Sequence, residues 1–274
     1  MTPGPGVYRE AAHYYVPGRP PYSRALLPTL ARELALDGHG RLLDVGCGPG
    51  FLTVDLAAAF DETVAVDPEP RMLAEGRRRA GAKRLTGIRW VRGVAEDLAH
   101  LEIGPCRLVT FGQSYHWTAG VPVLDTVHHL LEPGGAVALI GHRVEGRPEP
   151  EGPRLPRIPE DEIVALVQDF VDDDPGPRLI GQSKRATPHL YEADLRASLF
   201  GRCRTVYAPG RPDIVRDIDS VVAGYYSTSY AAPRRFGDSR GAFETAVREL
   251  LRRRSPEGLF WDWPGDTEIV VATR

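Results

Sequence analysis

Two aspartates and two histidines stand at the ends of apolar runs, and their side chains could do chemistry. Asp44 and Asp67 close the first two runs, and His116 and His142 follow two later ones. A carboxylate accepts hydrogen bonds from hydroxyl and amino groups, and an imidazole titrates near neutral pH and can take a proton. Apolar runs of this length favour buried strands, and parallel strands end at one edge of a sheet. We therefore expect the four side chains near a common ligand site.

A glycine loop follows the first apolar run and narrows the kind of ligand. Gly46, Gly48 and Gly50 give the pattern G-x-G-x-G, and a helix is expected from about Phe51. Dinucleotide sites need a glycine where Phe51 stands, and Pro49 lacks the backbone N–H that a pyrophosphate would use. The loop therefore favours a ligand with adenosine at one end and an amino-acid carboxylate at the other, near a helix N-terminus.

The loop sequence D-V-G-C-G-P-G at residues 44–50 resembles motif I of the class I S-adenosylmethionine (SAM) methyltransferases. The resemblance implies SAM as cofactor and S-adenosylhomocysteine as product. A nicotinamide or flavin site is the main alternative. Asp67 does not separate these readings, because a carboxylate at that position accepts both hydroxyls of a ribose in either kind of site.

The same resemblance implies which residues surround the cofactor. Asp44 would orient the amino group of SAM, Asp67 would hold the ribose, and Arg19 would pair with the carboxylate. Plainer alternatives are a loop-bracing role for Asp44 and helix-core packing for Met72. The residues expected at the cofactor are Tyr14, Tyr15, Arg19, Asp44, Gly46, Cys47, Gly48, Gly50, Asp67, Pro68, Met72, Ala95, Glu96, Gln113 and Ser114.

The segment Gln113–Trp117 carries the first candidate for a catalytic base. It resembles the Q-x-x-H-W pattern of the branch that includes trans-aconitate methyltransferase and the methyltransferase type 11 group, and it lacks the N/D-P-P-Y motif of some amino methyltransferases. His116 is the first candidate and His142 the second, because imidazole can act as a general base near neutral pH. The alternative for His116 is a histidine that hydrogen-bonds the backbone and shapes the pocket.

Composition limits the class of protein. The 274 residues include 42% hydrophobic residues, enough for a substantial core, and a net charge of −3 argues against a nucleic-acid partner. Three scattered cysteines predict a reduced, cytoplasmic protein with no metal site. No apolar run is long enough to span a bilayer, and residues 1–6 do not look like a signal peptide.

Alternating patterns predict an α/β fold. Strands are expected at 41–46, 63–67, 87–92, 107–112 and 135–141, then at 203–208 and 267–274. Helices are expected at 23–36, 51–60, 70–80, 121–131, 161–172, 216–229 and 238–254. The family resemblance implies a Rossmann-like, doubly wound, seven-stranded sheet with the order 3-2-1-4-5-7-6, its last strand antiparallel, and a mostly helical cap.

Four regions follow from this pattern. Residues 1–22 are expected to form an N-terminal lid segment and residues 23–142 the SAM-binding core. Residues 143–200 would supply a linker and cap insertion, and residues 201–274 the rest of the sheet with further cap helices. The cap would lie over the carboxyl ends of the strands, where ligands of such sheets bind.

The resemblance and the residues together predict a SAM-dependent methyltransferase. It would move a methyl group to an oxygen, nitrogen or carbon atom of a small molecule, expected to be a bacterial secondary metabolite. An RNA or protein methyltransferase, and a SAM-fold binding protein or cyclase without ordinary methyl transfer, stay open as alternatives. Monomer and homodimer are both open.

Overall fold

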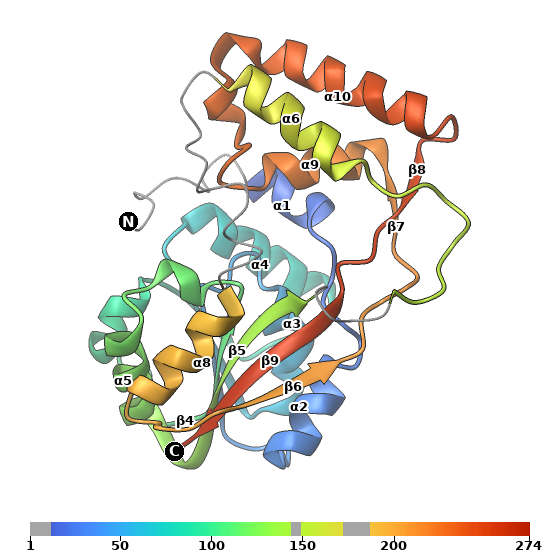
Figure 1. Ribbon diagram of the computed structural model, residues 1–274. Coiled ribbons are helices and arrows are strands. Elements are labelled where there is room, and N and C mark those ends of the chain that lie inside the picture. The colour runs from blue at the N-terminus through green and yellow to red at the C-terminus, as the bar shows by residue number, and fades with distance from the viewer. Residues whose placement is uncertain (1–11, 144–148, 172–186) are drawn as a thin grey trace.

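A seven-stranded mixed sheet forms the centre of the protein (Figure 1). The computed structural model describes residues 12–143, 149–171 and 187–274. The sheet has the order β3-β2-β1-β4-β5-β9-β6. Its strands are β1 (Arg41–Val45), β2 (Glu62–Asp67), β3 (Ile88–Arg92), β4 (Cys106–Gly112), β5 (Leu131–Arg143), β6 (Arg204–Ala208) and β9 (Asp266–Thr273).

The predicted strand order is confirmed. The first five strands are parallel, and β9 lies antiparallel between β5 and β6. The central strands are nearly continuous apolar runs because both of their faces are buried. Leu43 and Val45 of β1 face one hydrophobic cluster, while Leu42 faces another.

Helices cover both faces of the sheet. Val123 of α5 and Leu195 of α8 pack on the face that includes Leu43, whereas Leu30 of α2 and Leu56 of α3 pack on the face that includes Leu42. The α-helices of this layer are α2 (Leu26–Leu34), α3 (Phe51–Leu56), α4 (Pro70–Ala82), α5 (Val121–Leu130) and α8 (Thr187–Ala197). The 3₁₀ helices are η1 (Ala57–Ala59), η2 (Ala95–His100) and η3 (Tyr115–Trp117).

A second, mostly helical layer forms the cap. It contains α6 (Glu160–Phe170), α9 (Ile218–Tyr226), η4 (Pro233–Ser239), α10 (Arg240–Arg254) and the paired short strands β7 (Val215–Asp217) and β8 (Leu259–Trp261). Its core includes Ile163, Tyr226, Phe243 and Phe260. In Figure 1 the cap lies beyond the carboxyl end of β5, with helix α1 (Ala12–Gly18) between it and the sheet.

Four local features differ from the predictions. The helix expected from Ser23 begins at Leu26; Ser23 Oγ donates to the Pro209 carbonyl and accepts a hydrogen bond from the Ala25 N–H just before the helix. The helix expected from 216 begins at Ile218, and the residues before it form β7. Residues 12–18 of the lid segment are helical. Helix α8 falls in the range expected for the cap insertion, yet its Leu195 packs in the core of the sheet.

None of the helices within the described ranges is long and apolar enough to cross a membrane.

Candidate cofactor and acceptor site

The glycine loop between β1 and α3 is held in a left-handed backbone. Gly46, Gly48 and Gly50 have φ angles of +65°, +53° and +72°, which glycine adopts without steric cost. A Cβ on Gly46 would stand 2.5 Å from Ser114 Cβ, and one on Gly50 would stand 2.6 Å from the Trp90 ring. A Cβ on Gly48 would meet no described atom within 4 Å. Gly46 and Gly50 are therefore required by packing, and Gly48 faces open space that a ligand can enter.

Asp67 lies beside this open position at the end of β2. Its Oδ2 accepts a hydrogen bond from the Gly48 N–H at 2.8 Å, and its Oδ1 accepts one from the Glu69 N–H at 2.9 Å. Burial raises the pKa of Asp67 to about 6, although the two backbone hydrogen bonds act to lower it. Each carboxylate oxygen has a lone pair left, so the group can still accept hydrogen bonds from two ribose hydroxyls.

Asp44 joins β1 to helix α3 and strand β4 through buried hydrogen bonds. It is 1% exposed. It accepts hydrogen bonds from Thr53 Oγ1 at 2.6 Å, the Thr53 N–H at 3.1 Å and Thr110 Oγ1 at 2.9 Å. Burial raises its pKa to about 6, and the threonine hydrogen bonds lower it again in part. This geometry matches the bracing alternative, and contact with the SAM amino group stays a prediction.

Cys47 and Ser114 also support the loop. The Cys47 N–H donates to the Val66 carbonyl at 3.0 Å, and burial raises the pKa of the thiol well above its ordinary value. Ser114 Oγ donates to the Val45 carbonyl at 2.6 Å, directly under Gly46. Gln113 has a φ of +52° and donates its N–H to the Ile140 carbonyl at 2.9 Å. These contacts fix the loop against β2, β4 and β5.

The residues expected at the adenine are spread along the same edge. Ala95 is buried at the start of η2, and Glu96 is exposed and accepts a hydrogen bond from the Ala119 N–H at 2.9 Å. Pro68 is exposed, and Met72 is a buried residue of α4, which agrees with its helix-core alternative. Val94 was not predicted, yet its apolar side chain is 38% exposed beside Ala95.

His142, near the carboxyl end of β5, is the more enclosed of the two histidines. Its ring stacks on Tyr22 at 5.2 Å between centroids, and its Nδ1 is buried with no hydrogen-bond partner among the described residues. Burial and, to a smaller extent, the charge of Arg19 lower its pKa to about 4. The imidazole is therefore neutral at pH 7, and its Nδ1 is a buried nitrogen whose hydrogen-bonding capacity no described group satisfies.

His116 lies in η3 and is more open. Its Nδ1 is 3.4 Å from the Tyr191 hydroxyl, and its side chain is exposed. Surrounding protein atoms and Arg19 lower its pKa, but water reaches the exposed ring and moderates this shift. The charge of Arg19 lowers the pKa of both histidines, and of the two it is His142 whose Nδ1 is buried with no partner within the described chain.

The candidate cofactor-binding residues on and just after helix α1 point in two directions. Tyr15 faces the glycine loop, with its ring 6.1 Å from that of Phe51, and Arg19 lies over the Tyr15 ring at 5.2 Å. Tyr14 faces the cap, where its ring is 5.1 Å from that of Tyr226 and its hydroxyl accepts a hydrogen bond from Arg240 at 2.5 Å. Tyr15 and Arg19 are thus placed at the site, and Tyr14 packs away from it.

Tyr22 and Tyr191 complete the surroundings, although neither was proposed as a site residue. Burial raises the pKa of Tyr22 well above its ordinary value, and Tyr15, Asp44 and Tyr191 raise it further. The Tyr22 ring stacks on His142, and the Tyr191 hydroxyl lies 3.4 Å from His116 Nδ1, so each tyrosine contacts one of the two candidate bases. Tyr22 belongs to the tyrosine-rich lead-in at residues 14–22, which was the available signal in the sequence.

Comparisons with known proteins agree with this geometry. Residues 42–135 match the family described as "Methyltransferase domain". An uncharacterized methyltransferase of Mycobacterium tuberculosis is 32% identical over 137 residues, which cover 48% of this chain and 51% of that protein. A protein of Saccharomyces cerevisiae described as a probable S-adenosylmethionine-dependent methyltransferase is 27% identical over 130 residues, or 47% of this chain and 44% of that protein.

Solved structures share the fold at low sequence identity. The YcgJ protein of Bacillus subtilis has a TM-score of 0.51 at 15% identity, covering 90% of this chain and 97% of that chain. A structure solved in work on the conversion of a disulfide bond into a thioacetal group during echinomycin biosynthesis has a TM-score of 0.54 at 18% identity, covering 100% and 93%.

The chain spans about half the length of the curated relatives that it matches. The matched residues contain the glycine loop, Asp67 and β4, and the sheet order is the one that the motif implied. Residues 42–135 therefore belong to the class I S-adenosylmethionine-dependent methyltransferase family, and S-adenosylmethionine is the cofactor of this domain.

Proposed function

We propose that the protein is a methyltransferase that moves a methyl group from SAM to an oxygen, nitrogen or carbon atom of a small molecule. The observation that carries this proposal is the open backbone position at Gly48 beside the Asp67 carboxylate. The bound cofactor supplies an electrophilic methyl group on a sulfonium centre. A role in bacterial secondary metabolism and a cytoplasmic location are part of the proposal.

The chain's own residues would hold the cofactor at its two ends. Asp67 would accept the ribose hydroxyls, while Val94 and Ala95 would lie against the adenine. Arg19 would pair with the methionyl carboxylate, because its Nε is buried with no hydrogen-bond partner in the described part of the chain. Gly48 would let the ligand approach the backbone closely.

The surroundings of the proposed acceptor favour a small molecule. Helix α1 and the cap lie over the carboxyl end of β5 (Figure 1), the Tyr22 ring stacks on His142, and the Tyr191 hydroxyl lies 3.4 Å from His116. Enclosed aromatic surroundings suit a compact, partly apolar acceptor, and holding such an acceptor in line can supply roughly 7–11 kcal/mol of the barrier reduction. The net charge of −3 does not favour an extended nucleic acid.

His142 is the proposed proton acceptor when the methylated atom is an oxygen. Its imidazole is neutral at pH 7, its Nδ1 has no described hydrogen-bond partner, and its ring is oriented by stacking on Tyr22. It would take the proton of the acceptor hydroxyl as the new bond to carbon forms. An amine acceptor would need only to bind in its neutral form.

Titration calorimetry with S-adenosylhomocysteine and with NAD(H) tests the cofactor, and a panel of acceptors with methyl-labelled SAM tests the reaction. We expect binding of S-adenosylhomocysteine and transfer of label to small molecules. Absence of S-adenosylhomocysteine binding would contradict the proposal. Label transferred to RNA or protein alone would point to a macromolecular substrate, and binding without transfer to any acceptor would point to a SAM-binding protein or cyclase.

A further inference from the structure

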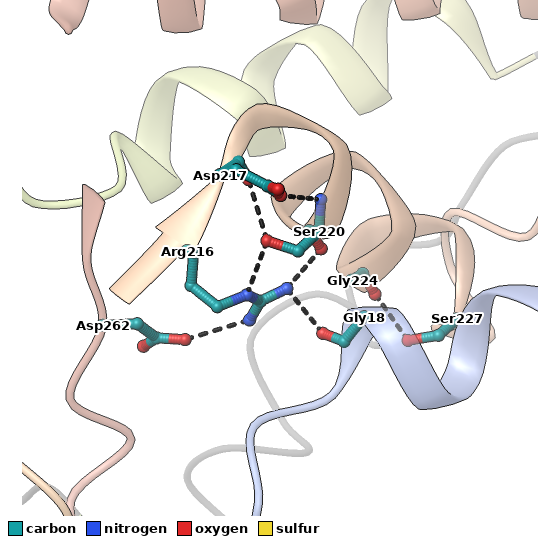
Figure 2. Close-up of polar contacts among 7 residues, drawn as sticks. All are labelled: Gly18, Arg216, Asp217, Ser220, Gly224, Ser227 and Asp262. Carbon is teal, nitrogen blue, oxygen red and sulfur yellow. Dashed lines mark hydrogen bonds and ion pairs between the residues drawn. The ribbon is translucent and has the colours of Figure 1, made fainter. Parts of the chain in front are cut away.

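Arg216 is a buried cation in the cap, away from the residues assigned above. It is 9% exposed at the centre of β7. Figure 2 shows its guanidinium between Asp262, Ser220 and the Gly18 carbonyl. Nη1 donates to Asp262 Oδ2 at 3.0 Å, Nε donates to Ser220 Oγ at 3.2 Å, and Nη2 donates to the Gly18 carbonyl at 2.7 Å and to the Ser220 carbonyl. A buried charge with this many partners holds them in a fixed arrangement.

Gly18 is the last residue of α1, and it packs directly against α9. A Cβ on Gly18 would stand 2.4 Å from the Ala223 carbonyl carbon, and one on Gly224 would stand 2.9 Å from the Gly18 carbonyl oxygen. The two backbones therefore approach more closely than any side chain would permit. Arg216 donates to the same Gly18 carbonyl, so it fastens α1 to the cap at this point.

One further contact holds the end of α1 to the cap. Arg19 Nη2 donates to the Ser227 carbonyl at 3.1 Å, just beyond α9. Ser227 in turn donates its hydroxyl to the Gly224 carbonyl at 2.6 Å (Figure 2). The end of α1 is thus set by the cap, whereas Tyr15 on the same helix packs near Phe51 at the end of the glycine loop and Arg19 lies over the Tyr15 ring.

We propose that Arg216 is a positioning residue for the donor site, which it reaches through Gly18. By fixing the Gly18 carbonyl, Arg216 sets the direction in which Arg19 and Tyr15 extend over the bound cofactor. The inference rests on the proposed function, since it assigns Arg19 and Tyr15 to the cofactor. Under this inference, a residue of the cap affects cofactor affinity although it lies outside residues 42–135, which match the methyltransferase domain family.

Three variants and a surface control test the proposal. Arg216→Met removes every donor to Gly18. Asp262→Asn removes the ion pair and keeps the donation to Gly18, so it lowers stability without releasing α1. Gly224→Ala keeps the Arg216 side chain, but its Cβ would stand 2.9 Å from the Gly18 carbonyl oxygen and 3.1 Å from Arg216 Nη2, so it disturbs the same contact from the α9 side. The control is Arg211→Met, because Arg211 lines a groove of about 500 Å³ together with Arg19 and Arg216 and pairs with the exposed Asp213.

We expect Arg216→Met and Gly224→Ala to weaken S-adenosylhomocysteine binding by about tenfold in calorimetry, which corresponds to the loss of one hydrogen bond to a charged group. Asp262→Asn and Arg211→Met should bind within about twofold of the wild type, whatever their melting temperatures. A purely structural role would instead weaken binding in proportion to lost stability, and Asp262→Asn would then follow Arg216→Met. Gly224→Ala decides the question if Arg216→Met fails to fold.

Hydrogen exchange of the ligand-free protein separates this inference from the proposed function. Amides of α1 should exchange faster in Arg216→Met than in the wild type, with the amides of β1 unchanged. If the wild type binds no S-adenosylhomocysteine, the proposed function fails and this measurement still shows whether Arg216 fastens α1. Unchanged exchange in α1, or wild-type affinity in a folded Arg216→Met protein, overturns the inference.

Discussion

The Gly48 N–H donates a hydrogen bond to Asp67 Oδ2 across 2.8 Å, which joins the glycine loop to the end of β2. Gly48 is the loop position whose side-chain direction is open, and Asp67 is the carboxylate beside it. This hydrogen bond thus sets the distance between the Gly48 backbone, which a ligand would approach, and the Asp67 carboxylate, which would accept hydrogen bonds from the ligand's hydroxyls.

Replacing Asp67 with alanine should weaken S-adenosylhomocysteine binding at least tenfold. A hydrogen bond to a charged group contributes roughly 1.5–3 kcal/mol, and the ribose would lose two of them. Calorimetry at pH 7.5 measures the change. Asp55→Ala is the matched control, because Asp55 lies on α3 and forms an exposed ion pair with Lys83. Unchanged affinity in Asp67→Ala would refute the ribose assignment.

Gly48→Ala should reduce cofactor affinity and should lower stability only by the cost of the left-handed backbone. The added Cβ meets no described atom, so its cost to folding is the left-handed backbone alone, about 1–2 kcal/mol. Gly87→Ala carries the same strain at a φ of +82°, also in open space, and lies outside the glycine loop. Equal S-adenosylhomocysteine affinity in the two variants would show that the ligand does not approach Gly48.

Asp44→Asn should gain stability relative to the wild type as the pH rises. The folded carboxyl group has a pKa of about 6 instead of 3.8, so between these values the folded state binds more protons than the unfolded state. The contribution of Asp44 to stability therefore falls as the pH increases from about 4 to 6, by up to about 3 kcal/mol, and asparagine lacks this dependence. Urea unfolding from pH 4 to 7 measures the difference between the two proteins. A difference that does not vary with pH would contradict the prediction.

With an oxygen acceptor, His142→Gln should lower kcat by about a hundredfold or more, the usual contribution of a general base. His116→Gln should lower it by less than about tenfold, since His116 is exposed and already bonded to Tyr191. Because the pKa of His142 is about 4, the wild-type rate should not fall between pH 8 and about pH 5 through this group. A larger loss in His116→Gln, or a fall in rate centred near pH 6.5, would exclude His142 as the base.

The sheet and the cofactor loop could be predicted from the sequence because both depend on local patterns. Apolar runs ending at Val45 and Asp67 are sufficient to identify strands, and glycines at fixed spacing identify the turn between strand and helix. The antiparallel direction of β9 was predicted from the family resemblance, because the spacing of hydrophobic residues alone does not give the direction of a strand.

Features that depend on contacts between distant segments were not predicted. Ser23 has the residue type of a helix cap, but its hydroxyl donates to the Pro209 carbonyl. Thr53 and Thr110 look ordinary in sequence, and only the fold brings both to Asp44. Arg216 was expected in a helix, whereas it lies in β7, which pairs with β8, and Asp217 caps α9 by accepting a hydrogen bond from the Ser220 N–H.

The bond between Gly18 and Arg216 also bears on how the protein assembles. The two residues are 198 positions apart. During synthesis α1 leaves the ribosome long before its partner helix exists, and pairings between such distant segments form slowly because a long loop must close first. We therefore expect β1, β2 and the glycine loop to take shape while the cofactor pocket is still uncovered, and the docking of α1 to be among the last steps of folding.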